Sequence, residues 1–185
     1  VLILGFPLLA GAQEAQKDSV TPDQIILDEV LVSAVRVTRE APVTFSNLKK
    51  ARIEKRNLGQ DIPILMNYLP SVVTTSDAGA GIGYTGIRVR GSDATRVNVT
   101  INGIPYNDAE SQGTFWVNMP DFASSVDNVQ IQRGVGTSTQ GAGAFGATVN
   151  FQTEGLNPDP YAEYHLVGGS FNTLRNTIKV GSGLL

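Results

Sequence analysis

The chain contains no cysteine, a single histidine and no run of basic residues. The lack of cysteine excludes disulfides, thiolate metal sites and cysteine nucleophiles in any redox compartment. His165 alone leaves little scope for imidazole chemistry, and we find no nucleophile with a base to activate it. A net charge of −3 without a basic stripe gives no attraction for phosphate backbones. We therefore predict that the protein is not an enzyme and that it has no cofactor, no metal site and no nucleic-acid partner.

Glycine is abundant by contrast, with 20 residues in a chain of 185, and most of them lie between Gly79 and Gly146. Glycine permits positive φ and close backbone approach, which indicates short strands joined by irregular loops. Two G-x-G-x-x-G matches, at residues 81–86 and 141–146, precede β-branched sequence instead of a helix. Without a helix N-terminus there is no reason to predict a dinucleotide site.

The first residues have the texture of an export signal. Residues 1–12 form an apolar run that is too short to span a bilayer and ends in Ala10-Gly11-Ala12. We interpret them as a signal peptide remnant, with the sequence beginning inside the gene product; the alternative is a buried strand or helix of the domain. Residues 13–27 are mostly polar, which predicts a flexible tether.

A β-prone stretch, residues 25–34, stands alone after this tether. It has no neighbouring strand to pair with. An isolated extended segment can add itself to the sheet edge of another protein, because its N–H and C=O groups are unpaired. The other interpretation is an ordinary edge strand of this domain.

The central part of the chain reads as a small α+β domain, residues 40–157. Two short helices come first, at residues 49–57 and 61–69, with Asp61 as a possible N-cap. Strands are predicted at residues 71–74, 86–90, 97–101, 126–132 and 147–152. Asn102-Gly103 lies between apolar residues and predicts a tight hairpin turn.

In the last segment, residues 158–185, apolar and polar residues alternate along the chain. Leu174, Ile178 and Val180 share one strand face, and Arg175, Thr177 and Lys179 share the other. Such alternation over about ten residues is typical of a barrel strand between lipid and a wet lumen. Because two strands cannot close a barrel, this hairpin would belong to a longer protein. A soluble hairpin packed on the domain is the alternative.

Several motifs together resemble one known family. Residues 85–91 read Thr-Gly-Ile-Arg-Val-Arg-Gly, and residues 96–105 read Arg-Val-Asn-Val-Thr-Ile-Asn-Gly-Ile-Pro. This pair is similar to the plug motif of TonB-dependent outer-membrane receptors, with Asn102 in place of the usual Asp. Residues 126–134 followed by residues 141–150 resemble the second signature, a strand entering Arg-Gly and a glycine-rich loop that returns to a strand. Gln132 and Val135 replace the usual acid and proline there.

Residues 27–34 resemble the Ton box and lie between tether and plug, as in that family. The resemblance implies a signal peptide, a plug of mixed sheet with short helices and Gly-rich loops, and the first antiparallel strands of a transmembrane β-barrel. The implied TonB-binding residues are Asp28, Glu29, Val30, Leu31, Val32, Ser33 and Ala34. The plug motif residues are Arg88, Arg90, Gly91, Asn102, Gly103, Arg133 and Gly134. We expect the three arginines among them to pair with acids of the barrel wall.

The resemblance further implies active import of a scarce solute across the bacterial outer membrane. TonB, with its inner-membrane energising complex, and outer-membrane lipid would be partners. Siderophore, haem, cobalamin and oligosaccharide all remain open as substrates. Loop residues expected to touch the solute are Ser76, Asp77, Tyr84, Gln112, Trp116, Gln140 and Phe145. A secreted β-rich binding or adhesion module without transport is the alternative function.

Overall fold

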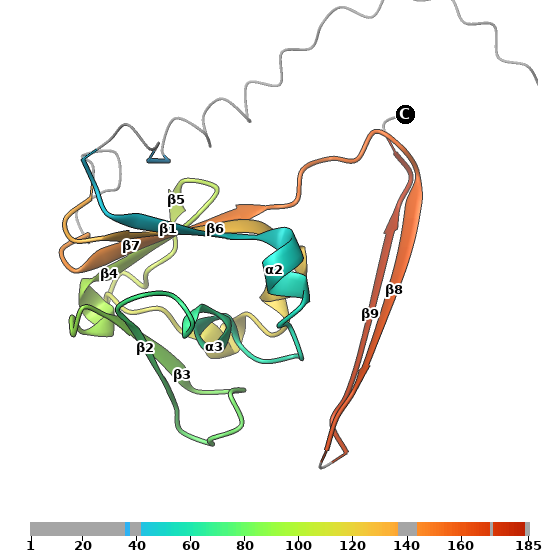
Figure 1. The fold of residues 1–185 in the computed structure, drawn as a ribbon, viewed down its shortest axis with the longest axis horizontal. Helices are drawn as coiled ribbons and strands as arrows, with labels where there is room; N and C mark the ends of the chain where they lie inside the picture. Colours follow the sequence, from blue (N-terminus) through green and yellow to red (C-terminus); the bar gives the residue numbers. More distant parts are fainter. Residues whose placement is uncertain (1–35, 38–41, 137–143, 171, 184–185) are drawn as a thin grey trace, which may run out of the picture.

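The computed structural model describes residues 36–37, 42–136, 144–170 and 172–183 of the chain. A five-stranded sheet in the order β1-β6-β7-β4-β5 forms its centre (Figure 1). The strands are β1 (Phe45–Lys49), β4 (Val97–Ile101), β5 (Ile104–Pro105), β6 (Val126–Arg133) and β7 (Ala147–Thr153). β4 and β7 are parallel and the other neighbours antiparallel, so the predicted mixed sheet is confirmed.

Two short helices and a second, two-stranded sheet lie on one side of the central sheet. α2 (Lys50–Glu54) follows β1 directly, and α3 (Ile62–Met66) leads to β2 (Val72–Ser76) and β3 (Thr85–Val89). The 3-10 helices η1 (Ala94–Arg96), η2 (Trp116–Asn118) and η3 (Phe122–Ser125) lie in the connections. In Figure 1, α3 lies between the central sheet and the β2–β3 hairpin.

The apolar core fills the space between these layers. Val129, Ile131, Val149 and Phe151 alternate along β6 and β7, and each is at most 2% exposed. Trp116 of η2 packs edge-on against Phe151, with ring centroids 5.9 Å apart. The period-2 alternation of these strands therefore directs one complete face of the sheet into the core.

The opposite face of the sheet is also largely buried, yet its side chains are polar. We call it the amide face; it consists of Asn98, Thr100, Asn128, Gln130, Gln132, Thr148, Asn150 and Gln152. These side chains bond to one another, as Gln132 Nε2 donates to Gln130 Oε1 at 3.0 Å and Asn150 Nδ2 donates to Thr100 Oγ1 at 2.8 Å. Arg36 and Val37 also contact this face and supply partners to Asn150 and Gln130. Two other buried oxygens of the face, Gln132 Oε1 and Thr148 Oγ1, have no hydrogen-bond partner among the described residues.

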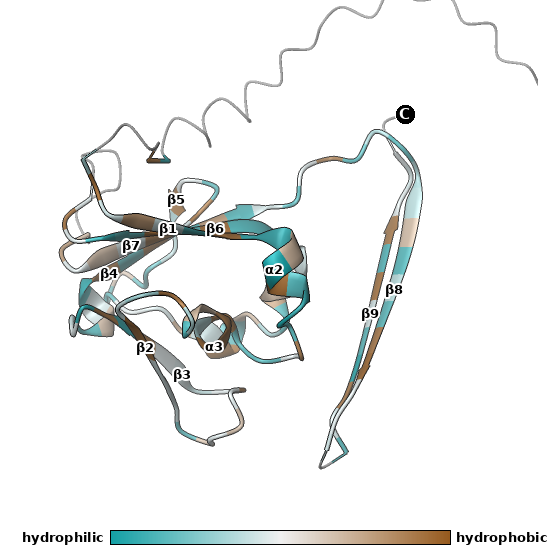
Figure 2. Ribbon diagram, in the orientation of Figure 1, coloured by the Kyte–Doolittle hydropathy of each residue, from teal (hydrophilic) through white to brown (hydrophobic). Residues whose placement is uncertain are grey.

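The C-terminal hairpin extends beside the rest of the molecule in Figure 1. It consists of β8 (Tyr161–Gly168) and β9 (Leu174–Gly181), paired antiparallel. Ile178 and Val180 on one face are 71% and 75% exposed, and Figure 2 shows the hydrophobic residues along β9. The predicted hairpin and its alternation are confirmed, whereas its membership in a barrel stays a prediction. No helix within the described ranges is long and apolar enough to cross a membrane.

The predicted elements occur in the predicted order, with three differences. The helices are shorter than expected, because α2 and α3 have only five residues each. Asp61 occupies the N-cap position of α3, but its side chain does not cap the helix; Asp61 Oδ2 accepts a hydrogen bond from Thr85 Oγ1 at 2.9 Å. β1 was not predicted, since its sequence FSNLK lacks regular alternation and its strand form depends on pairing with β6.

Candidate functional site

The Asn102-Gly103 turn joins β4 to β5 and adopts the predicted hairpin geometry. Asn102 and Gly103 have φ of 50° and 83°, and Ile101 pairs with Ile104. The Asn102 side chain also contacts β7, because Oδ1 accepts from the Thr153 N–H at 3.0 Å and Nδ2 donates to Thr153 Oγ1 at 2.8 Å. An aspartate at this position could accept the first bond but could not donate the second. The amide therefore fixes the turn to the end of β7.

Arg90 and Gly91 end β3 in a left-handed turn, with φ of 52° and 74°. The Arg90 N–H donates to the Ser71 carbonyl at 2.9 Å, and its guanidinium Nη2 donates to Thr44 Oγ1 at 2.8 Å. Arg88, which lies two residues earlier on β3, is exposed. Arg90 thus connects the small sheet to the residue that precedes β1.

Arg133 at the end of β6 makes contacts similar to those of Arg90. Its Nε donates to the Pro70 carbonyl at 2.9 Å, and its Nη2 donates to Ser46 Oγ of β1. Burial lowers the pKa of Arg133 from its ordinary value, and the nearby positive charge of Arg90 lowers it further. Gly134 follows with φ of 95°, and its N–H donates to the Gly146 carbonyl.

Arg90 and Arg133 together fasten the small sheet to β1 through neutral oxygens. Within the described residues no carboxylate contacts either guanidinium. Their expected pairing with acids of a barrel wall stays a prediction, but the structure already gives both arginines partners inside the domain. Within the domain, Arg90 and Arg133 therefore hold the two sheets together.

The hairpin contacts the rest of the molecule through an ion pair. We expected arginines of the central domain to pair with acids of the barrel wall, and in this ion pair the charges are the other way round. Arg175 of β9 forms a salt bridge with Asp121 at 2.8 Å and donates to the carbonyl of buried Asn57 at 2.9 Å. It also donates to Ser124 Oγ of η3. Thr177 donates to the other Asp121 oxygen at 3.1 Å. The hairpin supplies the cation here, and the central domain supplies the acid.

A second ion pair lies further along the same face of β9. Lys179 Nζ contacts both oxygens of Glu154, at 2.7 and 2.8 Å, and Lys50 of α2 reaches the same carboxylate at 3.0 Å. Burial alone would raise the pKa of Glu154, but the hydrogen bonds from Lys179 and Lys50 outweigh it, so this pKa lies below its ordinary value. Every inward residue from Arg175 to Lys179 therefore bonds to the domain. The alternation in the sequence identified this face, but not its partners.

The matched family is described as TonB-dependent Receptor Plug Domain, and the match covers residues 37–148, more than half of the chain. The chain belongs to this family. The plug identity accounts for the paired motifs at residues 85–105 and 126–150. It also favours a receptor component over the alternative of an adhesion module.

Two curated relatives are bacterial binding proteins. Hemoglobin-haptoglobin-binding protein A of Haemophilus influenzae is 27% identical over 139 residues, which cover 66% of this chain and 13% of the relative. Lactoferrin-binding protein A of Neisseria meningitidis serogroup B is 28% identical over 177 residues, which cover 81% of this chain and 18% of the relative. The chain thus spans less than a fifth of the length of either relative.

Solved structures of outer-membrane receptors share the fold of the plug. The ferripyoverdine receptor of the outer membrane of Pseudomonas aeruginosa gives a TM-score of 0.62 at 18% identity, covering 81% of this chain and 19% of that one. The ferric yersiniabactin uptake receptor FyuA from Yersinia pestis gives 0.58 at 15% identity, covering 77% and 22%. These similarities confirm the predicted fold class.

The plug's predicted solute-contacting residues are separated by the structure. Asp77 and Tyr84 are exposed at the tip of the β2–β3 hairpin, with Ser76 partly buried beside them. Gln112 and Phe145 are exposed in other loops, at the end of the sheet where β4 and β7 begin. Gln140 and residues 28–34, the predicted TonB-binding segment, lie outside the described residues.

Trp116 differs from the prediction, because it is only 3% exposed and belongs to the core. The indole of η2 packs against Phe151, so it offers no surface to a solute in this structure. Trp116 is the last residue of a predicted loop, but the large apolar area of its ring is better buried than exposed. We therefore drop Trp116 from the loop set.

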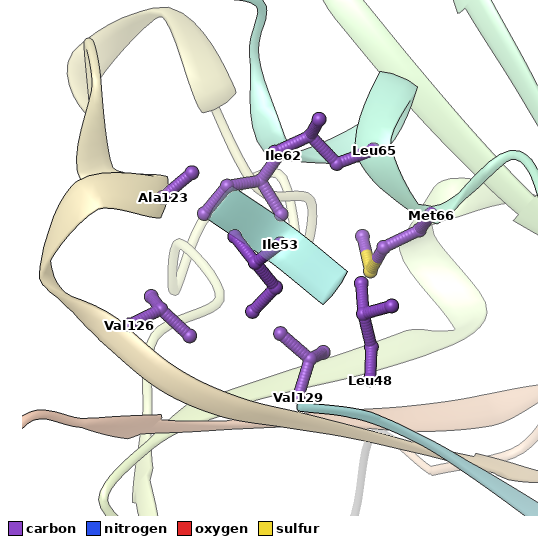
Figure 3. A pocket seen from close by; sticks show the side chains of 8 residues that line it. All are labelled: Leu48, Ile53, Ile62, Leu65, Met66, Ala123, Val126 and Val129. Carbon is purple, nitrogen blue, oxygen red and sulfur yellow. The ribbon is translucent and has the colours of Figure 1, made fainter. Parts of the chain in front are cut away.

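A small cavity inside the plug is not a solute site. Its volume is about 10 Å³, room for one water at most, and Figure 3 shows its apolar lining. The side chains come from β1, α2, α3, η3 and β6: Leu48, Ile53, Ile62, Leu65, Met66, Ala123, Val126 and Val129. Among the described residues, no group of three or more His, Asp or Glu could hold a metal ion.

Proposed function

We propose that the chain forms the plug and the first barrel strands of a receptor that imports a scarce solute across the bacterial outer membrane. The observation that supports this most is the pairing of a family plug with a hairpin of two unlike faces. The polar face of the hairpin bonds to the plug through Arg175 and Lys179, and its apolar face is exposed. A plug held against a barrel wall can close the lumen until a signal moves it.

The exposed face of the hairpin fits outer-membrane lipid. Its large hydrophobic residues are Tyr164, Leu166, Leu174, Ile178 and Val180, each at least 60% exposed. In water such a surface is an aggregation hazard, whereas in a bilayer it is matched to its surroundings. The paired backbone of β8 and β9 leaves two edges, which further strands of the barrel would complete.

The arrangement of the two hairpins supports one orientation of the plug. In Figure 1 the β8–β9 turn and the tip of the β2–β3 hairpin lie toward one side, and Arg36 and Val37 lie on the other side of the central sheet. With the preceding chain in the periplasm, the β2–β3 tip faces the outside. Asp77 and Tyr84 are then the plug residues best placed to meet a solute, while Gln112 and Phe145 lie nearer the rim of the sheet.

Energy would enter through residues 28–34. TonB would add this extended segment to one of its own sheet edges and pull it, driven by the inner-membrane proton gradient. Main-chain pairing of this kind tolerates varied side chains but needs free N–H groups. The relatives' names, with hemoglobin-haptoglobin and lactoferrin as ligands, support a surface receptor. We leave the substrate class as a siderophore, haem, cobalamin, oligosaccharide or a similar scarce solute.

The test is a proline at Val32. Val32→Pro removes one backbone donor from the TonB-binding segment, and Val32→Ala is the matched control because it keeps that donor. We expect the proline variant to lose most energised uptake while solute binding to cells stays unchanged, and the alanine variant to import normally. Normal uptake by Val32→Pro would show that residues 28–34 are not the TonB-binding segment.

A further inference from the structure

Arg36 lies across the amide face and bonds to three side-chain oxygens. Its Nη2 donates to Asn128 Oδ1 at 2.8 Å, its Nη1 to Gln152 Oε1 at 3.0 Å and its Nε to Asn150 Oδ1 at 3.3 Å. These acceptors come from neighbouring positions of β6 and β7, so one guanidinium bridges the two central strands. The planar arrangement of its donors suits such a divided set of acceptors.

Val37 continues this attachment through its backbone. The Val37 N–H donates to Gln130 Oε1 at 2.9 Å, and Gln130 Nε2 donates back to the Val37 carbonyl at 3.1 Å. The side-chain amide thus pairs with a peptide group as a neighbouring strand would. Gln130 is itself held by Asn47 of β1 and by Gln132, and it is 2% exposed. Five hydrogen bonds therefore attach two residues to the sheet.

All of these acceptors are uncharged. Burial lowers the pKa of Arg36 from its ordinary value, and the negative charge of Asp127 opposes that shift without contacting the guanidinium. Hydrogen bonds to neutral amides hold a cation less strongly than a buried carboxylate does. On separation, both the cation and the amide oxygens regain water, and no unpaired carboxylate is left behind. Such a contact fixes the position of residues 36–37, yet little free energy is needed to open it.

From this geometry we infer that Arg36 and Val37 form a releasable clasp, which fastens the chain preceding the plug across the amide face. Its role rests on the proposed function: the clasp lies two residues after Ala34, so a pull on residues 28–34 reaches the clasp before it reaches β1. While closed, the clasp keeps the TonB-binding segment next to the plug. When it opens, the pull passes to β1, and the amide face becomes accessible to water.

Hydrogen–deuterium exchange of residues 36–44 in the full-length receptor tests the clasp without TonB. Arg36→Ala removes three of the five bonds, and we expect exchange of the Val37 amide to become about tenfold faster. Arg36→Lys should lie between, because one ammonium cannot reach all three separated oxygens. Gln130→Ala removes the two bonds to Val37 and should give a similar increase.

Arg52→Ala is the matched control, because Arg52 is an exposed cation on α2 and forms no hydrogen bond or salt bridge with the amide face within the described part of the chain. Its exchange pattern at residues 36–44 should equal that of the unaltered receptor. A misfolded Gln130→Ala protein would show itself as faster exchange throughout β6 and β7, and the Arg36 variants then decide alone. Unchanged exchange in Arg36→Ala would overturn the clasp.

Titration with the periplasmic domain of TonB separates this inference from the proposed function. If the clasp limits access to residues 28–34, Arg36→Ala should bind that domain a few-fold more tightly than the unaltered receptor, since no affinity is lost to opening the clasp. Equal binding by both would overturn the role of the clasp in access. If neither binds while exchange at residues 36–44 still differs, the TonB proposal fails and the clasp stands.

Discussion

Arg36 and Arg175 both connect the plug to a neighbouring segment, and they do so by opposite means. Arg36 fastens the chain before the plug through the neutral oxygens of Asn128, Asn150 and Gln152. Arg175 fastens the hairpin after the plug through the carboxylate of Asp121, supported by a buried backbone carbonyl. Opening the first contact exposes one cation and neutral amides to water, whereas opening the second separates two opposite charges.

This difference divides the plug into a side that can be released and a side that stays attached. Removing one partner of a partly buried ion pair is costly, because the remaining charge loses its compensation. The Glu154 site repeats the charged arrangement with Lys179 and Lys50. The hairpin is therefore expected to stay bonded to Asp121, η3 and Glu154 under conditions that free residues 36–37.

The largest effect should follow from loss of the hairpin cation. Arg175→Ala leaves Asp121 without its cation and the Asn57 carbonyl without the Arg175 donor, and we expect the contact to be destabilised by about 2–3 kcal/mol. Hydrogen exchange of residues 118–126 in the receptor measures the change. Arg175→Lys keeps the charge and should recover part of the protection; equal protection in Arg175→Ala and the unaltered receptor would remove the distinction between the two arginines.

Salt should affect the Arg175 contact more than the Arg36 contact, although this effect is smaller than that of Arg175→Ala. Raising ionic strength from about 0.1 to 1 M shortens the Debye length from roughly 10 to 3 Å and weakens pairs of charges more than bonds to neutral groups. We expect exchange at residues 118–126 to rise about two- to threefold while residues 36–44 change little. The reverse order would mean that Arg36 depends on a charge outside the described contacts.

Acid should loosen the Glu154 site. Because the folded-state pKa of Glu154 lies below its unfolded value, the site contributes stability above the unfolded pKa and loses it as pH falls through the folded one. The thermal midpoint of the receptor should therefore fall more on acidification in the unaltered protein than in Glu154→Gln, which cannot ionise. Identical pH profiles for the two would show that Lys179 and Lys50 gain nothing from the charge.

The smallest effect concerns a single amide. Asn102→Gly removes both side-chain bonds to Thr153 and tolerates the positive φ of this position, so we expect a loss of about 0.5–1 kcal/mol. Denaturant unfolding of the plug measures it. Thr153→Val removes the Oγ1 acceptor of one of these bonds, so the double variant should be little less stable than Asn102→Gly. Full additivity would show that this bond does not form.

Sequence patterns predicted the order of elements well where the signal was local. The Asn102-Gly103 turn needs only two residues with positive φ, and β6 and β7 show their apolar face by alternation. The family resemblance added the grouping into plug and hairpin. β1 escaped prediction because FSNLK becomes a strand only through pairing with β6, more than 75 positions away.

The polar contacts were harder to predict, for a physical reason. Gln130 and Asn150 alternate with apolar neighbours exactly as solvent-facing residues would, so their burial depends on Arg36 and Val37 lying over them. The inward charges of β9 were identified, but the direction of pairing was not. We expected plug arginines to meet acids of the barrel, while the hairpin cations Arg175 and Lys179 meet plug acids here.

The position of β1 at the edge of the central sheet has a practical consequence. The inner pairings, β6 with β7 and β7 with β4, involve only residues 97–153, so no strand of the sheet's interior is contributed by the first 49 residues. Additional domains or tags joined ahead of residue 36 would therefore leave these inner pairings unchanged. The N-terminal side is thus the natural place to attach a probe or a pulling handle.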